Sequence, residues 1–467
     1  MMSGVRRAVF ASDLHLGSNP TLDDFTQDVE FESFLELPEL TPSGNDRVEL
    51  VLLGDSFDLW QAVSDGECHQ EKAKRIDLAY VAASEAGRLD GVRAKHLRWF
   101  QALGRFAERP GCRLVVVPGN HDHSLIDPTV QARLAGHLGL SGSDRLSFVN
   151  FYENPMLRLY ADHGNQYDHN NTYDDFARVD WSQDCRGYYF VKLFLNRIEY
   201  RDPRIDNSPS GWGAVWHWLR RTLDFTLLAT AIRYFWQYST DDRVPKPVTP
   251  FAARGVAEAI PQRGLLDLPA APQLLVSGSS ARSAERFFSA DTVMEEFLRE
   301  AYDASPEVRL AVNEILEAQE KHEGVRGTTR GTARRGVPRP KPSDRGRAGT
   351  RKPSTRRRPE VPRPLGRVRG VAATRGIAGP PEDVAWAENL FSDKPYFRDR
   401  LTPGAFQYVL FGHTHGALEH RLSNGAMYLN TGTWTTEGPG LPVAVAECPP
   451  GGTPTAKLFR FKKGRLE

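Results

Sequence analysis

The sequence predicts an α/β fold, because strand patterns alternate with helical patterns near the N-terminus and a second run of strands closes the chain. The apolar runs Val5–Ala11, 49–53 and 113–117 are rich in Val and Leu and are bounded by turn residues, as buried strands are. A stretch at 70–106 is rich in Ala, Lys, Glu and Arg and indicates helical structure between the second and third of these strands. With 467 residues, the chain is long enough for one large domain with insertions, or for two domains.

Further strands are expected where short apolar runs are separated by Gly, Asn or Pro turns. Two of them follow the third strand, at 147–152 and 156–160, and four lie near the C-terminus, at 407–411, 426–430, 443–447 and 456–461. Helical patterns occupy the intervening part of the chain, at 173–198, 212–238, 291–304, 307–322 and 382–391.

Composition divides the chain into an interrupted core, a helical insertion and a basic linker. Residues 1–172 and 381–467 are predicted to form the core, and residues 173–323 the helical insertion or cap. Residues 324–380 hold almost no large apolar side chains and cannot bury enough surface to offset chain entropy, so we expect a disordered linker. Within it, 326–375 contains 17 Lys and Arg but two acidic residues, about +15 in a chain of net charge +1. The rest of the chain is therefore acidic, at about −14.

The basic linker is most simply a flexible, solvated segment, and binding to nucleic acid or to an anionic membrane is the alternative. It contains no motif that reads a nucleic-acid groove, so no sequence-specific nucleic-acid binding is expected. The four cysteines are widely spaced and form no CxxC pair, which is typical of reduced thiols in a cytosolic protein. Neither a signal-peptide core nor an apolar run of about 20 residues is present, so a cytoplasmic location is expected.

Five short polar motifs follow the predicted strands. They are Asp13-Leu14-His15, Gly54-Asp55-Ser56-Phe57-Asp58, Gly119-Asn120-His121-Asp122, His163-Gly164 and Gly412-His413-Thr414-His415. Ligand sites of open α/β sheets lie at the carboxyl ends of the strands, so these motifs are expected to converge.

The residue types in these motifs suit a dinuclear metal centre. Carboxylate, imidazole and amide oxygen bind Mn, Fe or Zn, and no thiolate is present to favour a soft metal. In an extended segment, side chains two residues apart point to the same face, so Asp13 with His15 and His413 with His415 are expected to act as pairs. The glycines are expected to let the backbone turn tightly beside the ions.

In this order, the motifs DxH, GDxxD, GNHD, a single His and GHxH resemble those of the calcineurin-like metallophosphoesterase superfamily. The resemblance covers roughly 1–170 and 400–467 and implies a four-layer αββα sandwich of two packed mixed sheets, here with a large helical insertion. It also implies two divalent transition-metal ions, Mn²⁺ first, with Fe or Zn as alternatives. Their ligands would be Asp13, His15 and His415 for one ion, Asn120, His163 and His413 for the other, and Asp55 as the bridge.

The resemblance implies a phosphoesterase in which a hydroxide shared by the two ions attacks phosphorus. Two divalent ions and two aspartates leave a positive centre that suits a phosphate and its transition state. His121 would stabilise that state or protonate the leaving oxygen, and Asp58 would orient His121. A structural role is the alternative for His121, and a helix N-cap is the alternative for Asp58.

The substrate is expected to be a phosphate ester or phosphoanhydride, with lipid- or nucleotide-linked phosphoanhydrides first. The outline is similar to that of UDP-2,3-diacylglucosamine diphosphatases, which have an apolar helical insertion before GHTH and an Asn-Thr-Gly-Thr-Trp segment after it, here 430–434. A soluble phosphodiesterase or phosphatase acting on nucleotides or phosphoproteins is one alternative. A non-catalytic metal-bound scaffold is another. Residues that bind the rest of the substrate are unknown from the sequence.

Some residues have two interpretations. The segment from Trp212 to Tyr238 holds eight aromatic side chains; a buried cap helix is the first interpretation, and peripheral contact with the inner face of a membrane is the second. If it is buried, the helix at 188–195 is a suitable packing partner. Asp122 is expected to bond nearby backbone. His123 and the run 165–169 either face substrate or are ordinary polar loop residues.

Overall fold

The computed structural model describes residues 5–44, 46–62, 81–168, 170–199, 225–245, 306, 308–311, 313, 382–390, 406–435 and 440–467. These residues all belong to one compact unit, which comprises Met1–Leu316 and Pro381–Glu467. Several predictions fall outside the described residues: the helix at 291–304, most of 307–322, the first half of the Trp212–Tyr238 segment, and the basic linker at 324–380. Among the helices that the structure describes, none combines the length and apolar character needed to cross a bilayer.

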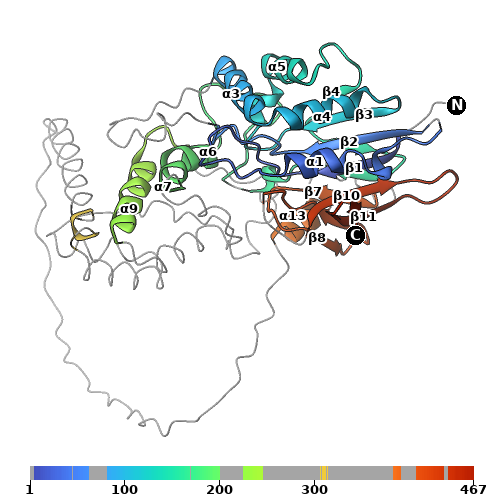
Figure 1. The fold of residues 1–467 in the computed structure, drawn as a ribbon. Coiled ribbons are helices and arrows are strands. Elements are labelled where there is room, and N and C mark those ends of the chain that lie inside the picture. Colours follow the sequence, from blue (N-terminus) through green and yellow to red (C-terminus); the bar gives the residue numbers. More distant parts are fainter. Residues whose placement is uncertain are drawn as a thin grey trace, which may run out of the picture. The chain divides into compact units, whose positions relative to one another are not determined.

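The larger sheet has seven strands, four of which run parallel (Figure 1). The parallel strands are β1 (Val5–Ala11), β2 (Arg47–Leu53), β3 (Cys112–Val117) and β4 (Leu146–Phe148). Beyond β1, the sheet continues antiparallel through β10 (Leu441–Glu447), β11 (Thr455–Lys462) and β12 (Arg465–Leu466). The two ends of the described chain are thus joined in one sheet.

The smaller sheet has five strands in the order β5-β6-β7-β9-β8. They are β5 (Tyr152–Asn154), β6 (Leu159–Ala161), β7 (Tyr408–Phe411), β9 (Met427–Asn430) and β8 (Leu418–Arg421). The three central strands, β6, β7 and β9, run parallel. This sheet therefore also combines the N-terminal and C-terminal parts of the predicted core.

The sheets pack face to face, and alternate residues of each strand point to opposite faces. In β1, Ala8 and Phe10 belong to the apolar cluster between the two sheets, whereas Val9 and Ala11 belong to the cluster beneath the helices of the larger sheet. A third cluster lies on the outer face of the smaller sheet and includes Val384 of α13 (Glu382–Leu390). The α/β fold with two packed mixed sheets is confirmed, with helices on both outer faces.

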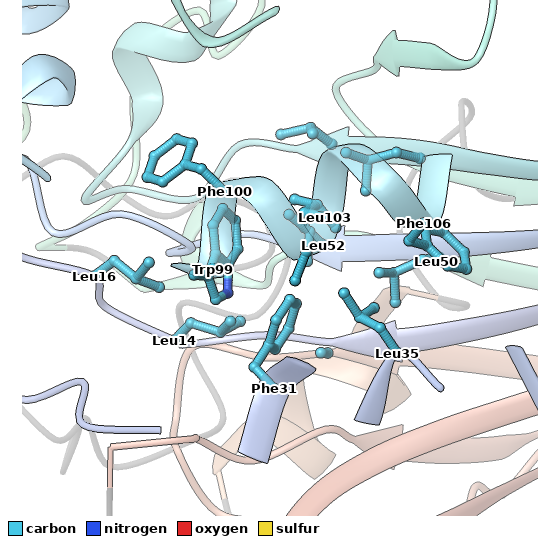
Figure 2. Packing of buried hydrophobic residues seen from close by; sticks show 14 of the residues in the cluster. Leu14, Leu16, Phe31, Leu35, Leu50, Leu52, Trp99, Phe100, Leu103 and Phe106 are labelled. Atoms are coloured by element: carbon cyan, nitrogen blue, oxygen red, sulfur yellow. The ribbon is translucent and has the colours of Figure 1, made fainter. Parts of the chain in front are cut away.

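Helices α1 (Asp28–Phe34), α3 (Ala82–Lys95), α4 (Leu97–Glu108) and α5 (Pro128–Leu138) accompany the larger sheet. In Figure 2, Trp99 of α4 faces Phe31 of α1, and the two rings stack at 5.1 Å between centroids. Because these rings are fully buried, they anchor two helices to the sheet that carries β1–β3. The stretch predicted as helical at 70–106 is described from residue 81 onward and forms two helices, α3 and α4, rather than one.

The insertion departs from its prediction. Helical structure was expected from 173 to 198, but it begins at α6 (Arg186–Phe190) and continues through a π-helical turn, η5 (Val191–Leu195), into α7 (Asn196–Glu199). Before residue 186 the chain forms turns, because carboxylates bond nearby backbone: Asp175 accepts from the N–H of Ala177 at 3.1 Å, and Asp180 from that of Ser182 at 2.9 Å.

Strand prediction was wrong at two places. The run at 147–152 was expected as one strand. It instead contains the last residues of β4, in the larger sheet, and the first residue of β5, in the smaller sheet. The pattern did not reveal β8 and β12, which are short, polar edge strands. Edge strands lack the apolar run that signals a buried strand.

The described half of the Trp212–Tyr238 segment is helix α9 (Phe225–Thr240). Its Phe235 ring lies 6.1 Å from Phe194, and its Tyr238 ring lies 5.5 Å from Phe190. These aromatic residues of α9 therefore pack on the turn at 188–195, as the buried interpretation requires.

Candidate metal centre

The polar motifs lie together at one end of the two sheets, beyond the carboxyl ends of β1–β3 and of β6 and β7. The backbone joins their loops: the N–H of Asp13 donates to the carbonyl of Gly54 at 3.1 Å, and that of His15 to Asp55 at 2.9 Å. The two sheets are joined at this end by the backbone N–H of His413, which donates to both carboxylate oxygens of Asp13 at 3.1 Å.

Five candidate ligands have backbone in the left-handed region: Asp13 (φ 51°), His15 (52°), Asp55 (49°), His413 (68°) and His415 (60°). The expectation that the two pairs lie in extended segments is therefore wrong. Left-handed backbone is costly for residues other than glycine, and it is found mostly where the surrounding structure imposes it, often at functional sites. Asp13 and His15 converge on one ligand group because of this tight loop geometry and not because of strand alternation, whereas His413 and His415 belong to different groups.

Two glycines are required by the space that ligand side chains occupy. A Cβ atom on Gly119 would lie 2.1 Å from Oδ1 of Asp55, and one on Gly54 would lie 2.2 Å from Nδ1 of His163. Any side chain at these positions would displace a candidate ligand, so these glycines provide room for the ligands as well as tight turns.

The first ligand group consists of Asp13, His15 and His415, whose ligand atoms all lie within 4.8 Å of one another. The Nε2 atoms of the two histidines are 3.1 Å apart, and Nε2 of His415 lies 3.3 Å from Oδ1 of Asp13. Asp13 is fully buried, whereas the side chain of His415 is 45% exposed. This group therefore lies at the open side of the centre.

The second ligand group consists of Asp55, His163 and His413, again with ligand atoms within 4.8 Å of one another. Nε2 of His163 lies 3.0 Å from Oδ2 of Asp55, while its Nδ1 lies 3.0 Å from the carbonyl of Leu53. A donor at Nδ1 fixes the tautomer and leaves Nε2 for a metal. Oδ2 of Asp55 is also 3.9 Å from Nε2 of His15, so Asp55 stands between the two groups.

Asn120 lies next to Asp55 through its neighbours: the backbone N–H of His121 donates to Oδ1 of Asp55 at 2.8 Å. The Asn120 side chain is buried, and its Oδ1 accepts no hydrogen bond from the residues that the structure describes. Buried polar oxygens are seldom left unbonded, and a metal ion would satisfy this one. The donor set of carboxylate, imidazole and amide oxygen thus fits divalent transition metals.

The electrostatics of the centre also fit a cation. Burial by itself lowers the pKa of His163, but the carboxylates of Asp55 and Asp13 outweigh burial and raise this pKa to about 10. Burial by itself raises the pKa of Asp55, but the imidazoles of His163 and His121 hold it well below its ordinary value. A potential that stabilises a proton on a buried imidazole also favours a divalent ion in its place.

His121 lies at the edge of the centre, with its side chain 18% exposed. Its Nδ1 lies 3.0 Å from Oδ1 of Asp58, and its ring meets that of His15 edge-on at 4.7 Å. Burial opposes a charge on His121, but Asp58 and Asp55 raise its pKa above the ordinary value. A carboxylate on one ring nitrogen leaves the other for a reacting group, as a general acid needs. His121 also forms a metal-compatible group with His15 and Asp55, so the ligand role is the competing interpretation.

Asp58 contacts more than His121. Its Oδ2 also lies 3.6 Å from Nδ1 of His15, so one buried carboxylate contacts two imidazoles of the centre. Its Oδ1 additionally accepts the N–H of Gln61 at 2.9 Å, within a turn at 59–61. No described helix begins at Asp58, so the contacts to the imidazoles are its observed geometry and its orienting role stays a prediction.

Asp122 and His123 bond the structure around the centre. Asp122 accepts backbone N–H bonds from Gly119 at 2.6 Å and from Ser56 at 2.9 Å, which confirms its expected structural role. His123 is buried, and its ring stacks on Tyr173 at 3.8 Å, so the alternative that it faces substrate is wrong.

Within the run 165–169, Asn165 is buried and donates to the carbonyl of Asn171 at 2.8 Å. Asp168 contacts a candidate ligand directly: its Oδ2 lies 3.2 Å from Nε2 of His413. It is thus a carboxylate beside a candidate ligand, a common partner of metal-binding histidines. Residue 169 lies outside the described residues.

Two features of the centre were missed by sequence reasoning. The 430–434 segment supports the first ligand group, since the hydroxyl of Thr433 and the backbone N–H of Trp434 donate to the carbonyl of Asp13 at 2.8 and 3.1 Å. Trp60 is buried and lies against His121. Its place two residues after Asp58 is the only signal that the sequence offers.

Comparison with known proteins adds no family. No protein-family model matches the chain, and no curated protein matches it. The function must be inferred from the chemistry of the site.

Proposed function

We propose that this protein is a dinuclear-metal phosphoesterase of the calcineurin-like superfamily, which hydrolyses a phosphate ester or phosphoanhydride. The observation that carries the proposal is the pair of His/Asp groups that share the neighbourhood of Asp55. Asp13, His15 and His415 would hold one ion, Asn120, His163 and His413 the other, and Asp55 both. When bound, two such ions supply positive charge for the phosphate and lower the pKa of a water molecule between them.

The residues around the ions divide the remaining tasks. His121 and His415 are the most exposed of these side chains, so a phosphate would enter on their side. Asp58 holds Nδ1 of His121, which leaves Nε2 to donate a proton to the leaving oxygen. The buried carboxylates of Asp13 and Asp55 would offset part of the charge of the bound ions. These assignments suit a reaction in which negative charge grows on the leaving group.

The finer proposal is a lipid- or nucleotide-linked substrate. It rests on the aromatic insertion. The described aromatic residues of α9 pack on 188–195 within the insertion. The candidate lipid contact is therefore the part at 212–224, which lies outside the described residues. Peripheral attachment to the inner face of a membrane depends on the same segment and stays a prediction. A soluble phosphodiesterase or phosphatase acting on nucleotides or phosphoproteins would use the same centre.

A substrate panel with purified protein tests the proposal. Protein loaded with Mn²⁺ is expected to hydrolyse bis-p-nitrophenyl phosphate and at least one of UDP-diacylglucosamine, a cyclic nucleotide or a phosphopeptide, and chelation is expected to abolish turnover. Liposome flotation measures membrane attachment separately. Two tightly bound ions without turnover of any phosphoester would favour the non-catalytic scaffold. Full activity with no more than one bound ion would contradict the dinuclear centre.

A further inference from the structure

Trp60 covers the imidazole of His121. The two rings stack with centroids 4.0 Å apart and an interplanar angle of 29°, and Trp60 is 3% exposed. Among the described rings, the next nearest to His121 after Trp60 is that of His15, at 4.7 Å. A flat contact at this distance restricts tilting of the smaller ring, whereas the contact between Asp58 and Nδ1 by itself restrains only one edge.

Trp60 is in turn held by the insertion. Its carbonyl accepts a hydrogen bond from Nδ2 of Asn196 in α7 at 3.2 Å. Its ring meets that of Tyr188 in α6 edge-on at 5.9 Å. The next residue, Gln61, donates to the buried carboxylate of Glu199. Three side chains of the insertion thus contact the segment 58–61. This segment carries Asp58 and Trp60, the two side chains that contact the His121 ring.

The arrangement separates two tasks that a single contact cannot perform. Asp58 selects which ring nitrogen of His121 is held, because its Oδ1 lies 3.0 Å from Nδ1. The indole face limits the plane of the ring, because a larger tilt than the observed 29° would bring the two π-systems together. A proton donor misplaced by about 1 Å loses on the order of 10²-fold in rate, so the plane matters as much as the nitrogen.

We propose that Trp60 is a positioning residue: it fixes the plane of the His121 imidazole and links that plane to the helical insertion through Asn196. The inference rests on the proposed function of His121. It gives the insertion a role in the reaction that does not depend on substrate binding.

A double-mutant cycle tests this inference with Mn²⁺-loaded full-length protein and two aryl phosphodiesters, one with a p-nitrophenyl and one with a phenyl leaving group. Trp60→Leu is expected to lower kcat about 10- to 100-fold and to change KM less than about threefold. The loss is expected to be greater for the phenyl ester, whose poorer leaving group needs the proton more. Trp60→Phe, which keeps an aromatic face, is expected to recover most of the rate.

The decisive comparison is in the His121→Ala background. If Trp60 acts through His121, adding Trp60→Leu to His121→Ala is expected to cause no further loss of kcat. An equal loss in both backgrounds would show a merely structural role and overturn the inference. Phe106→Leu, a change of a buried aromatic side chain in the apolar cluster of the larger sheet, is the control for lost packing and is expected to show no such coupling. Metal content measured in every variant excludes loss of ions as the cause.

Asn196→Ala provides the same test if Trp60→Leu does not fold. It removes the hydrogen bond to the carbonyl of Trp60 and leaves the indole in place. We expect a loss of kcat of about three- to tenfold with His121 present and none with His121→Ala. An equal loss in both backgrounds would again overturn the inference. A wild-type protein that turns over no phosphoester would contradict the proposed function as well, whereas turnover with uncoupled effects would contradict the positioning role alone.

Discussion

The metal-centre loops and the helical insertion differ in what surrounds their buried polar groups. In the loops, left-handed backbone and glycines bring carboxylates and imidazoles within 4.8 Å of one another, a grouping that fits a metal ion. In the insertion, buried polar side chains lie against neighbouring side chains: the guanidinium of Arg197 lies 3.4 Å from the centroid of the Tyr234 ring and donates to Gln237 at 2.6 Å. One region gathers candidate metal ligands, and the other packs its polar groups among aromatic side chains.

This difference predicts which substitutions change catalytic rate and which change the free energy of unfolding. Changes of candidate ligands in the loops should remove metal and rate while the fold persists. Changes in the apolar packing of the insertion, away from its contacts with Trp60 and Gln61, should weaken the fold and leave the chemistry of the folded molecules largely intact. The four experiments below test that separation, from the largest expected effect to the smallest.

Asp55→Ala is expected to have the largest effect, because this carboxylate lies between the two ligand groups. We expect loss of both ions and a fall in kcat/KM of about 10⁴-fold or more. Elemental analysis and steady-state kinetics measure the two effects. Asp180→Asn, at an exposed turn, is the matched control and is expected to keep metal and rate. Metal retention by the Asp55 variant would exclude the bridging role.

His121→Ala is expected to keep both ions and to lower the rate about 10²- to 10⁴-fold, the usual range for a general acid or base. This outcome would separate His121 from the ligands within the same loops. Metal analysis of the purified variant decides the question, since His121 also lies in a metal-compatible group with His15 and Asp55. Metal loss equal to that of Asp55→Ala would make His121 a ligand.

Phe194→Ala tests the insertion. Phe194 is fully buried and contacts the rings of Phe190 and Phe235, so its truncation is expected to cost about 3–5 kcal/mol of unfolding free energy. Denaturant unfolding measures this loss, and the rate per folded molecule is expected to change less than about tenfold. Met156→Ala, at a side chain that is 39% exposed, is the control and should change stability by less than about 0.5 kcal/mol. An unchanged unfolding midpoint for Phe194→Ala would show that the insertion does not support the fold.

His96 supplies a pH-dependent contribution in the core, away from both regions. Burial opposes its charge, but hydrogen bonds to Asp23 and Asp28 raise its pKa to about 9 from the ordinary 6.5. A raised pKa stabilises the fold below pH 6.5, and this stability is lost as pH rises through 9. Compared with His96→Gln, the wild type is therefore expected to be more stable by on the order of 2 kcal/mol at pH 6 and to lose that advantage above pH 9. Denaturant unfolding at several pH values measures the difference, and a constant difference would contradict the assignment.

Local patterns were sufficient for much of this protein. Val5–Ala11 was predicted with its observed bounds, and the next two strands, β2 and β3, within two residues, because runs of Val and Leu at strand length leave few alternatives. The candidate ligands were likewise identifiable, since carboxylates and imidazoles directly after strands are uncommon without a ligand. Asn120 and His163 gained meaning only from their order among the other motifs.

What only the tertiary structure decided involves residues that are far apart in the chain. Trp60 meets His121 across 61 residues, and its bond to Asn196 spans 136, so no periodicity or short motif signals either contact. The left-handed backbone at Asp13 and His413 was equally hidden, because propensity assigns such angles to glycine and tertiary hydrogen bonds impose them here. Sequence determines what each segment favours locally, whereas the contacts between distant segments depend on how the whole core packs. The positions of the side chains that support the centre are fixed by that packing.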